Sequence, residues 1–136
     1  MLVKTFRFEI HGDDRGSLIS LEENKDFPFE VKRVYYIFKT LPDVRRGFHA
    51  HKKLQQILVC VNGSCKIHLD NGLGETAEVL LNDPAVGLYI ANDTWREMYD
   101  FSEQAVLMVL ASEHYDESDY IRNYDKFLEY VKGEKQ

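Results

Sequence analysis

Turn-forming residues divide this chain into short apolar segments, and that pattern constrains its fold more than any other feature of the sequence. The segments are rich in β-branched and aromatic side chains, which is typical of β-strands. They comprise residues 18–21, 31–38, 56–61, 64–69, 77–81, 86–90 and 105–110. Strands that recur at this spacing predict an all-β sandwich or barrel with mainly antiparallel sheets. Asn62-Gly63 and Asn71-Gly72 are expected to form hairpin turns, and Asn82-Asp83-Pro84 is expected to end a strand.

The hydrophobic period changes near the C-terminus. From Asp116 onward, apolar residues recur at steps of three and four, which predicts one face of an amphipathic helix. The residues on that face are Tyr120, Ile121, Tyr124, Phe127, Leu128 and Val131. We therefore expect one domain over residues 1–136, with a barrel over about 1–112 and a helical segment over about 116–132.

Composition excludes several classes of protein. The net charge of −6 disfavours nucleic-acid binding, because proteins of that class carry a basic surface. The chain has no apolar run long enough for a membrane helix, and its N-terminus lacks a secretory signal core, so we expect a cytoplasmic protein. Cys60 and Cys65 are accordingly expected to be buried free thiols.

Two histidines, His49 and His51, are separated by one residue in a segment with strand character. Alternate residues of a strand project to the same face, so both imidazoles are expected to enter one cavity. Imidazole takes and returns a proton near neutral pH and also ligates metals. The pair therefore indicates either proton transfer or a metal site.

The residues at the positions where further metal ligands would be expected are unsuitable ligands, so the sequence favours proton transfer over a metal site. The spacing of the histidine pair and of a later Pro-x-x-Gly segment imitates the metal site of cupin barrels. However, Gln56 stands where the acidic ligand is expected, and Arg96 stands where the distal histidine is expected. Arginine stays protonated and repels a nearby cation, so these residues make a poor metal site. We expect no metal and no cofactor.

Six blocks of the sequence resemble one enzyme family. They are RVYYI (33–37), RGFHAHKKL (46–54), VCVNGS (59–64), DPAVGLY (83–89), LAS (110–112) and YDESDYIRNY (115–124). In this order they are similar to the dTDP-4-keto-6-deoxyhexose 3,4-ketoisomerases, also called WxcM-like cupins, and the similarity spans nearly the whole chain.

The resemblance implies an all-β cupin-type double-stranded β-helix, a jelly-roll barrel, with a short C-terminal helix. It also implies a metal-independent isomerase, usually a homodimer with exchanged strands. The substrate would be dTDP-4-keto-6-deoxyglucose, and the product would serve the synthesis of 3-amino-3,6-dideoxy sugars for surface polysaccharides, such as lipopolysaccharide or S-layer glycans, or for natural products.

Moving a ketone from C4 to C3 requires removal of the C3 proton, an enediol(ate) and protonation at C4, and histidine suits both steps. We assign His49 as the principal base and His51 as the group that shuttles or orients protons at the oxygens, although the two roles could be exchanged. Tyr35 is a candidate hydroxyl donor to the sugar, or else a half-buried barrel tyrosine.

Arginines are the candidate groups for the diphosphate, which guanidinium groups bind in a bidentate manner. Arg33, Arg46 and Arg122 lie in three of the matching blocks. Thymine requires a flat apolar partner, for which Tyr36, Tyr89 and Tyr120 are the options.

By the resemblance, two further substrate-binding positions, Arg15 and Arg96, track the C4 configuration of the product. Arg15 is similar to galacto-type members and Arg96 to gluco-type members, so the pattern is mixed. Because a permanently charged Arg96 replaces a possible proton donor to C4, the sequence favours the 3-keto-6-deoxyglucose product. Trp95 either walls the sugar pocket or packs in the core.

Two other functions are compatible with the sequence. One is a metal-dependent cupin oxygenase, which would share the barrel and the histidine pair. The other is a protein that binds the same nucleotide sugar, as a noncatalytic module or as a 3,5-epimerase.

Overall fold

A computed structural model describes residues 2–135 of the chain. Its strands form two five-stranded sheets and one separate hairpin. In spatial order, the first sheet contains β1 (Lys4–Arg7), β9 (Val86–Ile90), β6 (Gln56–Asn62), β11 (Val106–Ala111) and β4 (Arg33–Ile37). The second contains β12 (Tyr120–Ile121), β5 (Arg46–His51), β10 (Trp95–Tyr99), β7 (Cys65–Asp70) and β8 (Thr76–Leu81). The hairpin pairs β2 (His11–Asp13) with β3 (Gly16–Leu18).

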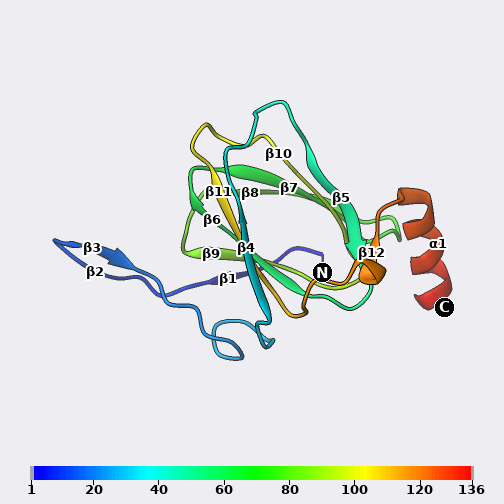
Figure 1. The fold of residues 1–136 in the computed structure, drawn as a ribbon, viewed down its shortest axis with the longest axis horizontal. Helices are drawn as coiled ribbons and strands as arrows, with labels where there is room; N and C mark the ends of the chain where they lie inside the picture. Colours follow the sequence, from blue (N-terminus) through cyan, green and yellow to red (C-terminus); the bar gives the residue numbers. More distant parts are fainter. Residues whose placement is uncertain (1, 136) are drawn as a thin grey trace.

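The two sheets face each other and enclose the core of a barrel (Figure 1). All pairings between the named strands are antiparallel, as the turn pattern predicts. Strands that follow one another along the chain often enter opposite sheets, as β5 and β6 do. This is the cupin-type double-stranded β-helix that the sequence predicts.

Apolar side chains from both sheets fill the barrel at one end. On β6, Leu58 and Cys60 point into this core, and Ile67 and Leu69 of β7 meet them from the other sheet. Cys60 and Cys65 are buried and unpaired by a disulfide, as expected. At the other end, the inward positions of the strands carry polar residues, so the strand alternation that builds the core also builds a polar cavity.

The N-terminal region forms a covering layer and a projecting arm. Phe8, Phe27 and Phe29 pack with Ile57 and Val59 on the outer face of the first sheet. The β2–β3 hairpin extends away from the barrel (Figure 1). The strand expected over residues 18–21 is wrong in its extent, because β3 ends at Leu18 and the following residues leave the hairpin to cover the sheet.

One expected hairpin is wrong. Asn62-Gly63 joins β6 to β7, but these strands lie in different sheets and do not pair with each other. The turn is nevertheless formed, with Gly63 at a positive φ of 72°. Asn71-Gly72 does lie in a hairpin, between the paired strands β7 and β8. Asn-Gly specifies a local reversal, whereas strand pairing is decided by the surfaces that each strand buries.

The helix begins later than the period predicts. A 3₁₀ turn, η1, spans Glu117–Asp119, and the helix α1 spans only Tyr124–Lys135. Asp116 caps η1 by accepting a hydrogen bond from the backbone N–H of Ser118. Tyr120 and Ile121 belong to β12, which pairs with β5, so their helical spacing with Tyr124 is coincidental.

The apolar pattern of the sequence does not predict strands β1, β2 and β10. They contain few consecutive apolar residues, and β10 places Arg96 and Glu97 at its centre.

Within residues 2–135, no helix has the length and apolar character needed to cross a membrane.

Helix α1 packs on the barrel through Phe127 and Val131, which are both fully buried. The Phe127 side chain packs against Trp95 of β10 and Tyr124, with ring centroids 5.7 and 6.1 Å away. We expect Phe127→Ala to lower the free energy of unfolding by about 3–5 kcal/mol, the usual cost of deleting a buried phenyl ring. Chemical denaturation measures this effect. Lys132→Ala, on the exposed face of α1, is the matched control and should change stability by less than about 0.5 kcal/mol.

Candidate active site

A cleft of about 530 Å³ opens at the polar end of the barrel. Strands β4, β5 and β12 supply most of its wall. Its lining residues are Arg33, Tyr35, Tyr36, Ile37, Phe38, Arg46, Gly47, His49, Met98, Tyr120 and Arg122. The cleft therefore combines one imidazole, three guanidinium groups and several aromatic rings.

A β-bulge in β5 sets the position of the histidines. Gly47 and Phe48 both have positive φ, 95° and 57°, and the pairing with β10 skips Phe48. A Cβ atom on Gly47 would lie 2.9 Å from the backbone oxygen of Arg96, so glycine is required there for space as well as for conformation. After the bulge, His49 and His51 share the inward face of β5, and Ala50 between them packs on the outer side with Ile121 and Phe127.

The two imidazoles and the Tyr120 ring form a three-ring cluster. The ring centroids of His49 and His51 are 5.0 Å apart and nearly perpendicular. Tyr120 of β12 lies opposite His51 in the pairing register, and its ring centroid is 4.4 Å from that of His51 and 5.1 Å from that of His49. His49 lines the cleft, whereas the His51 side chain is fully buried.

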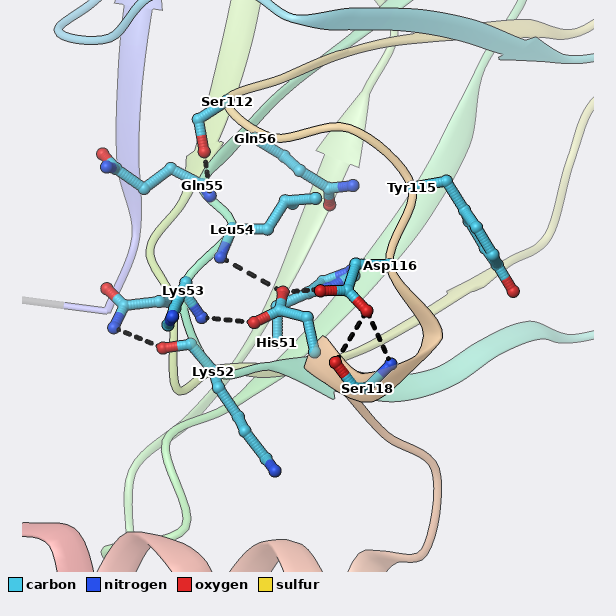
Figure 2. A network of polar contacts seen from close by, with 12 residues as sticks. His51, Lys52, Lys53, Leu54, Gln55, Gln56, Ser112, Tyr115, Asp116 and Ser118 are labelled. Carbon is cyan, nitrogen blue, oxygen red and sulfur yellow. Dashed lines mark hydrogen bonds and ion pairs between the residues drawn. The ribbon is translucent and has the colours of Figure 1, made fainter.

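Asp119 at the end of η1 contacts the inner histidine. Its Oδ2 lies 3.1 Å from Nδ1 of His51. The same carboxylate accepts hydrogen bonds from the backbone N–H groups of Lys53 and Leu54, which Figure 2 shows as dashed lines from those two nitrogens. The other imidazole nitrogen, His51 Nε2, is buried and has no hydrogen-bond partner among the described residues, and the same holds for His49 Nδ1.

Arg96 lies inside the barrel close to the imidazoles. Its side chain is among the largest fully buried groups, with 1% exposure, and it pairs in register with His49. One Nη atom donates to Oε1 of Gln56, and the other donates to the backbone oxygen of Thr94 at 3.0 Å. Gln56 in turn donates to the Tyr35 hydroxyl at 3.1 Å. Arg96 and Gln56, which occupy the positions where metal ligands are expected in cupins, thus form a hydrogen-bonded chain with Tyr35. Residues 2–135 contain no group of three or more His, Cys, Asp or Glu that could hold a metal ion.

Burial and this guanidinium govern protonation in the cluster. Burial, together with the positive charge of Arg96, lowers the pKa of His49 to about 3 and that of His51 to about 2. Burial also lowers the pKa of Arg96 to about 10 and raises that of Tyr35. At neutral pH both histidines are therefore neutral, with one ring nitrogen of each free of a proton, while Arg96 stays charged.

Three of the five arginines singled out in the sequence meet at the cleft. Arg33 lies over the rings of Tyr35 and Tyr115, and its Nε and one Nη are buried without hydrogen-bond partners. Arg46 lines the cleft beside Gly47. Arg122 lies over the Tyr120 ring at 4.2 Å and binds both carboxylate oxygens of Glu117.

The other two arginines lie elsewhere. Arg96 lies inside the barrel and does not line the cleft. Arg15 lies at the tip of the β2–β3 arm, where its 86% exposed side chain pairs with Asp13 at 2.6 Å. Within one chain, the structure does not bring Arg15 to the histidines.

The structure places some of the aromatic residues that were candidates for contact with thymine or the sugar at the cleft and others in the core. Tyr36 and Tyr120 line the cleft, whereas Tyr89 packs with Phe6 and Phe29 and donates to Gln55. Trp95 is buried against α1 and belongs to the core.

Sequence reasoning missed Asp119 and the position of Tyr120 beside both imidazoles. No local signal links Asp119 to His51, because the two residues lie 68 positions apart in the sequence.

The buried neutral histidines predict a pH dependence of stability. An unfolded histidine has a pKa of about 6.5, so below that value the unfolded chain binds protons that the folded chain does not. We expect the contribution of these two groups to the free energy of unfolding to be nearly constant above about pH 7 and to fall by roughly 2–4 kcal/mol between about pH 7 and pH 5. Denaturation curves across this range measure the slope. Replacing both histidines by Asn should remove most of the slope, whereas His114→Asn, at an exposed position, should retain it.

Known proteins share both the fold and the sequence. The family model described as "FdtA: WxcM-like, C-terminal" matches residues 1–132. A TDP-4-oxo-6-deoxy-α-D-glucose-3,4-oxoisomerase from Aneurinibacillus thermoaerophilus is 56% identical over 128 residues, which cover 94% of this chain and 91% of that protein.

Solved structures agree with this match. A histidine-to-asparagine variant of the 3,4-ketoisomerase QdtA from Thermoanaerobacterium thermosaccharolyticum, in complex with TDP-4-keto-6-deoxyglucose, superposes with a TM-score of 0.93 at 51% identity and covers 97% of this chain and 95% of that one.

Two Campylobacter jejuni enzymes also match. The TDP-quinovose 3,4-ketoisomerase WlaRB has a TM-score of 0.89 at 53% identity and covers 93% of this chain and 97% of its own. The TDP-fucose-3,4-ketoisomerase WlaRA has the same TM-score at 35% identity, with 96% of each chain covered. With a family model that matches nearly the full length and relatives above 50% identity, this chain belongs to the WxcM-like family that includes the TDP-sugar 3,4-ketoisomerases.

Proposed function

We propose that this protein is an isomerase that converts dTDP-4-keto-6-deoxyglucose to the 3-keto sugar by histidine acid–base catalysis. The observation that carries this proposal is a pair of buried imidazoles with ring centroids 5.0 Å apart, one of which lines a cleft that also contains three arginines. The names of the relatives, which include the complex with TDP-4-keto-6-deoxyglucose, support the same reaction.

The reaction only relocates hydrogen. A base removes the proton from C3, and the electrons of that bond form the C3–C4 double bond of an enediol(ate), while O4 gains a proton. A proton is then added to C4, and O3 loses its own to become the ketone. No electron leaves the sugar, so two groups that exchange protons at neutral pH are chemically sufficient.

We assign the C3 proton to His49, because it is the imidazole that lines the cleft. His51 lies behind it, and its unpartnered Nε2 supports the proposed role of exchanging protons with the sugar oxygens at the inner end of the cleft. Tyr35 lines the same cleft and receives a hydrogen bond from Gln56, which leaves its hydroxyl proton available for a sugar oxygen.

The arginines are suited to the diphosphate. Arg33, Arg46 and Arg122 give the cleft a local positive charge in a protein with a net charge of −6. Arg33 is the most favourable of them, since two of its nitrogens lack partners and would be satisfied by phosphate oxygens. Tyr36 or Tyr120 would then stack on thymine.

We propose the gluco product, dTDP-3-keto-6-deoxyglucose. Arg96 is held inside the barrel by Gln56 and Thr94, stays charged at neutral pH and cannot deliver a proton to C4. The identity of 53% to the TDP-quinovose enzyme against 35% to the TDP-fucose enzyme supports this choice, because quinovose is 6-deoxyglucose. A 3-keto sugar of this kind is the substrate that an aminotransferase needs to make a 3-amino-3,6-dideoxy sugar.

We further propose a homodimer in which the β2–β3 arms are exchanged. The arm exposes Ile10 and Leu18, and the outer face of β4 exposes Val34, so both surfaces would gain from mutual burial. Exchange would also carry Arg15 from the arm tip of one protomer toward the cleft of its partner, where the sequence resemblance implies that it acts.

Incubation with dTDP-4-keto-6-deoxyglucose in D2O tests the reaction. Nuclear magnetic resonance should show a new ketone at C3, deuterium at C4 and the gluco configuration. His49→Asn should lower kcat by about 10²- to 10⁴-fold because it removes the base. His114 is exposed and does not line the cleft, so His114→Asn should leave kcat unchanged. Normal turnover by the His49 variant would refute its role as the principal base.

The same experiment separates the other candidate functions. Exchange at C3 and C5 with the C4 ketone retained would indicate a 3,5-epimerase, and absence of turnover would indicate a binding module. Loss of turnover on chelation, together with stoichiometric iron or nickel by elemental analysis, would indicate a metal-dependent oxygenase.

Arm exchange can be tested by mixing two inactive variants. If Arg15 acts in the partner's cleft, refolding equal amounts of His49→Asn and Arg15→Ala chains should restore about a quarter of wild-type activity, because half of the dimers then contain one intact site. If Arg15 acts within its own chain, every mixed dimer has a defect in both sites and the mixture stays inactive. Light scattering should report a dimer in both cases.

A further inference from the structure

The side chain that faces His51 from η1 has a fixed orientation of its own. Asp119 Oδ1 accepts the backbone N–H of Lys53 at 2.8 Å, and Oδ2 accepts that of Leu54 at 3.3 Å. The backbone oxygen of Asp119 also accepts the N–H of Lys52 at 3.0 Å. The turn that follows β5 is thereby attached to η1, and the carboxylate cannot rotate away from His51 without losing two hydrogen bonds.

The turn that carries Asp119 is stabilised independently of it. Asp116 accepts hydrogen bonds from the backbone N–H and the hydroxyl of Ser118, as the dashed lines in Figure 2 show. Asp116 and Asp119 thus lie one turn apart on the same short element, but only Asp119 reaches the imidazole cluster.

A carboxylate accepts hydrogen bonds and does not donate them, so the His51 nitrogen that faces it must carry the proton. Neutral His51 is therefore the Nδ1–H tautomer, and its lone pair is on Nε2. That nitrogen is the one that is buried without a partner. The basic atom of His51 is thus set by a contact on the opposite side of the ring.

The charged groups around His51 have opposing effects on its protonation. The charged groups around His51 that disfavour its imidazolium form are Arg96, Arg33 and Arg122, and the neighbouring imidazole of His49 adds to them. Among the described side chains, Asp119 supplies the carboxylate that hydrogen bonds to His51, and its own side chain is only 11% exposed. It would stabilise the imidazolium at the moment when His51 holds a proton.

We propose that Asp119 is a positioning residue for the isomerisation: it holds the His51 imidazole in the Nδ1–H tautomer and provides the counter-charge for its protonated form. The proposal rests on the proposed function of His51 in proton exchange. It assigns no contact between Asp119 and the sugar, because Asp119 acts on the far side of the ring.

The substitution Asp119→Asn tests the tautomer directly. An asparagine can still accept the Lys53 N–H with its oxygen, but it then turns its NH₂ group toward His51. The imidazole must accept this hydrogen bond at Nδ1 and carry its proton on Nε2, where it can no longer act as a base. Nitrogen-15 resonances of labelled imidazoles should show the Nδ1–H form in the wild type and the Nε2–H form in the variant, without any substrate.

The kinetic consequence should appear in kcat. We expect Asp119→Asn to lower kcat by on the order of 100-fold, while KM changes less than about threefold, because the substrate contacts remain. Asp119→Glu, which keeps an acceptor-only group, should recover a measurable part of kcat and the wild-type tautomer. Asp116→Asn is the matched control, with wild-type kcat and tautomer, and thermal unfolding of each variant reports whether the turn is intact.

The outcomes separate this proposal from the proposed function. If the tautomer is unchanged in Asp119→Asn, or if Asp116→Asn reduces kcat equally, Asp119 has only a structural role and the proposal is wrong. If the tautomer inverts while wild-type protein does not isomerise the keto sugar, the positioning contact exists and the assignment of the reaction is wrong instead.

Discussion

The burial of one guanidinium group underlies the chemistry of this protein. Arg96 places a positive charge inside the barrel, where Gln56 and the Thr94 backbone satisfy two of its nitrogens without neutralising it. A buried cation is costly unless it is hydrogen bonded, which explains why Gln56 is buried beside it. The same charge and the same exclusion of water keep His49 and His51 neutral.

The site is divided into an outer and an inner part. The outer part contains Arg33, Arg46 and Arg122, which line the cleft. The inner part contains the two imidazoles and Tyr120, and it is bounded by Asp119 on one side and Arg96 on the other. The charge state of the inner imidazole therefore depends on its burial and on the guanidinium groups of Arg96, Arg33 and Arg122.

Local rules explain where the sequence reading succeeded and where it failed. The strand alternation around His49 and His51 was readable, because each strand residue contributes to one face or the other whatever it packs against. The end of the chain was misread because Tyr120 and Ile121 have helical spacing with Tyr124, while pairing with β5 places them in a strand. Asn62-Gly63 was read correctly as a turn and wrongly as a hairpin, because strand pairing across a barrel is not a local property.

The sequence by itself determined the all-β fold, the shared face of the histidine pair, the family and the three arginines that meet at the cleft, since these follow from residue types, periodicity and similarity over the whole chain. Only the tertiary structure decided which histidine lines the cleft, that Arg96 is an internal cation, and that Asp119 contacts His51 across 68 positions of sequence. The physical reason is that burial and hydrogen bonding between distant segments depend on how the two sheets close, and closure brings together residues whose spacing along the chain carries no signal.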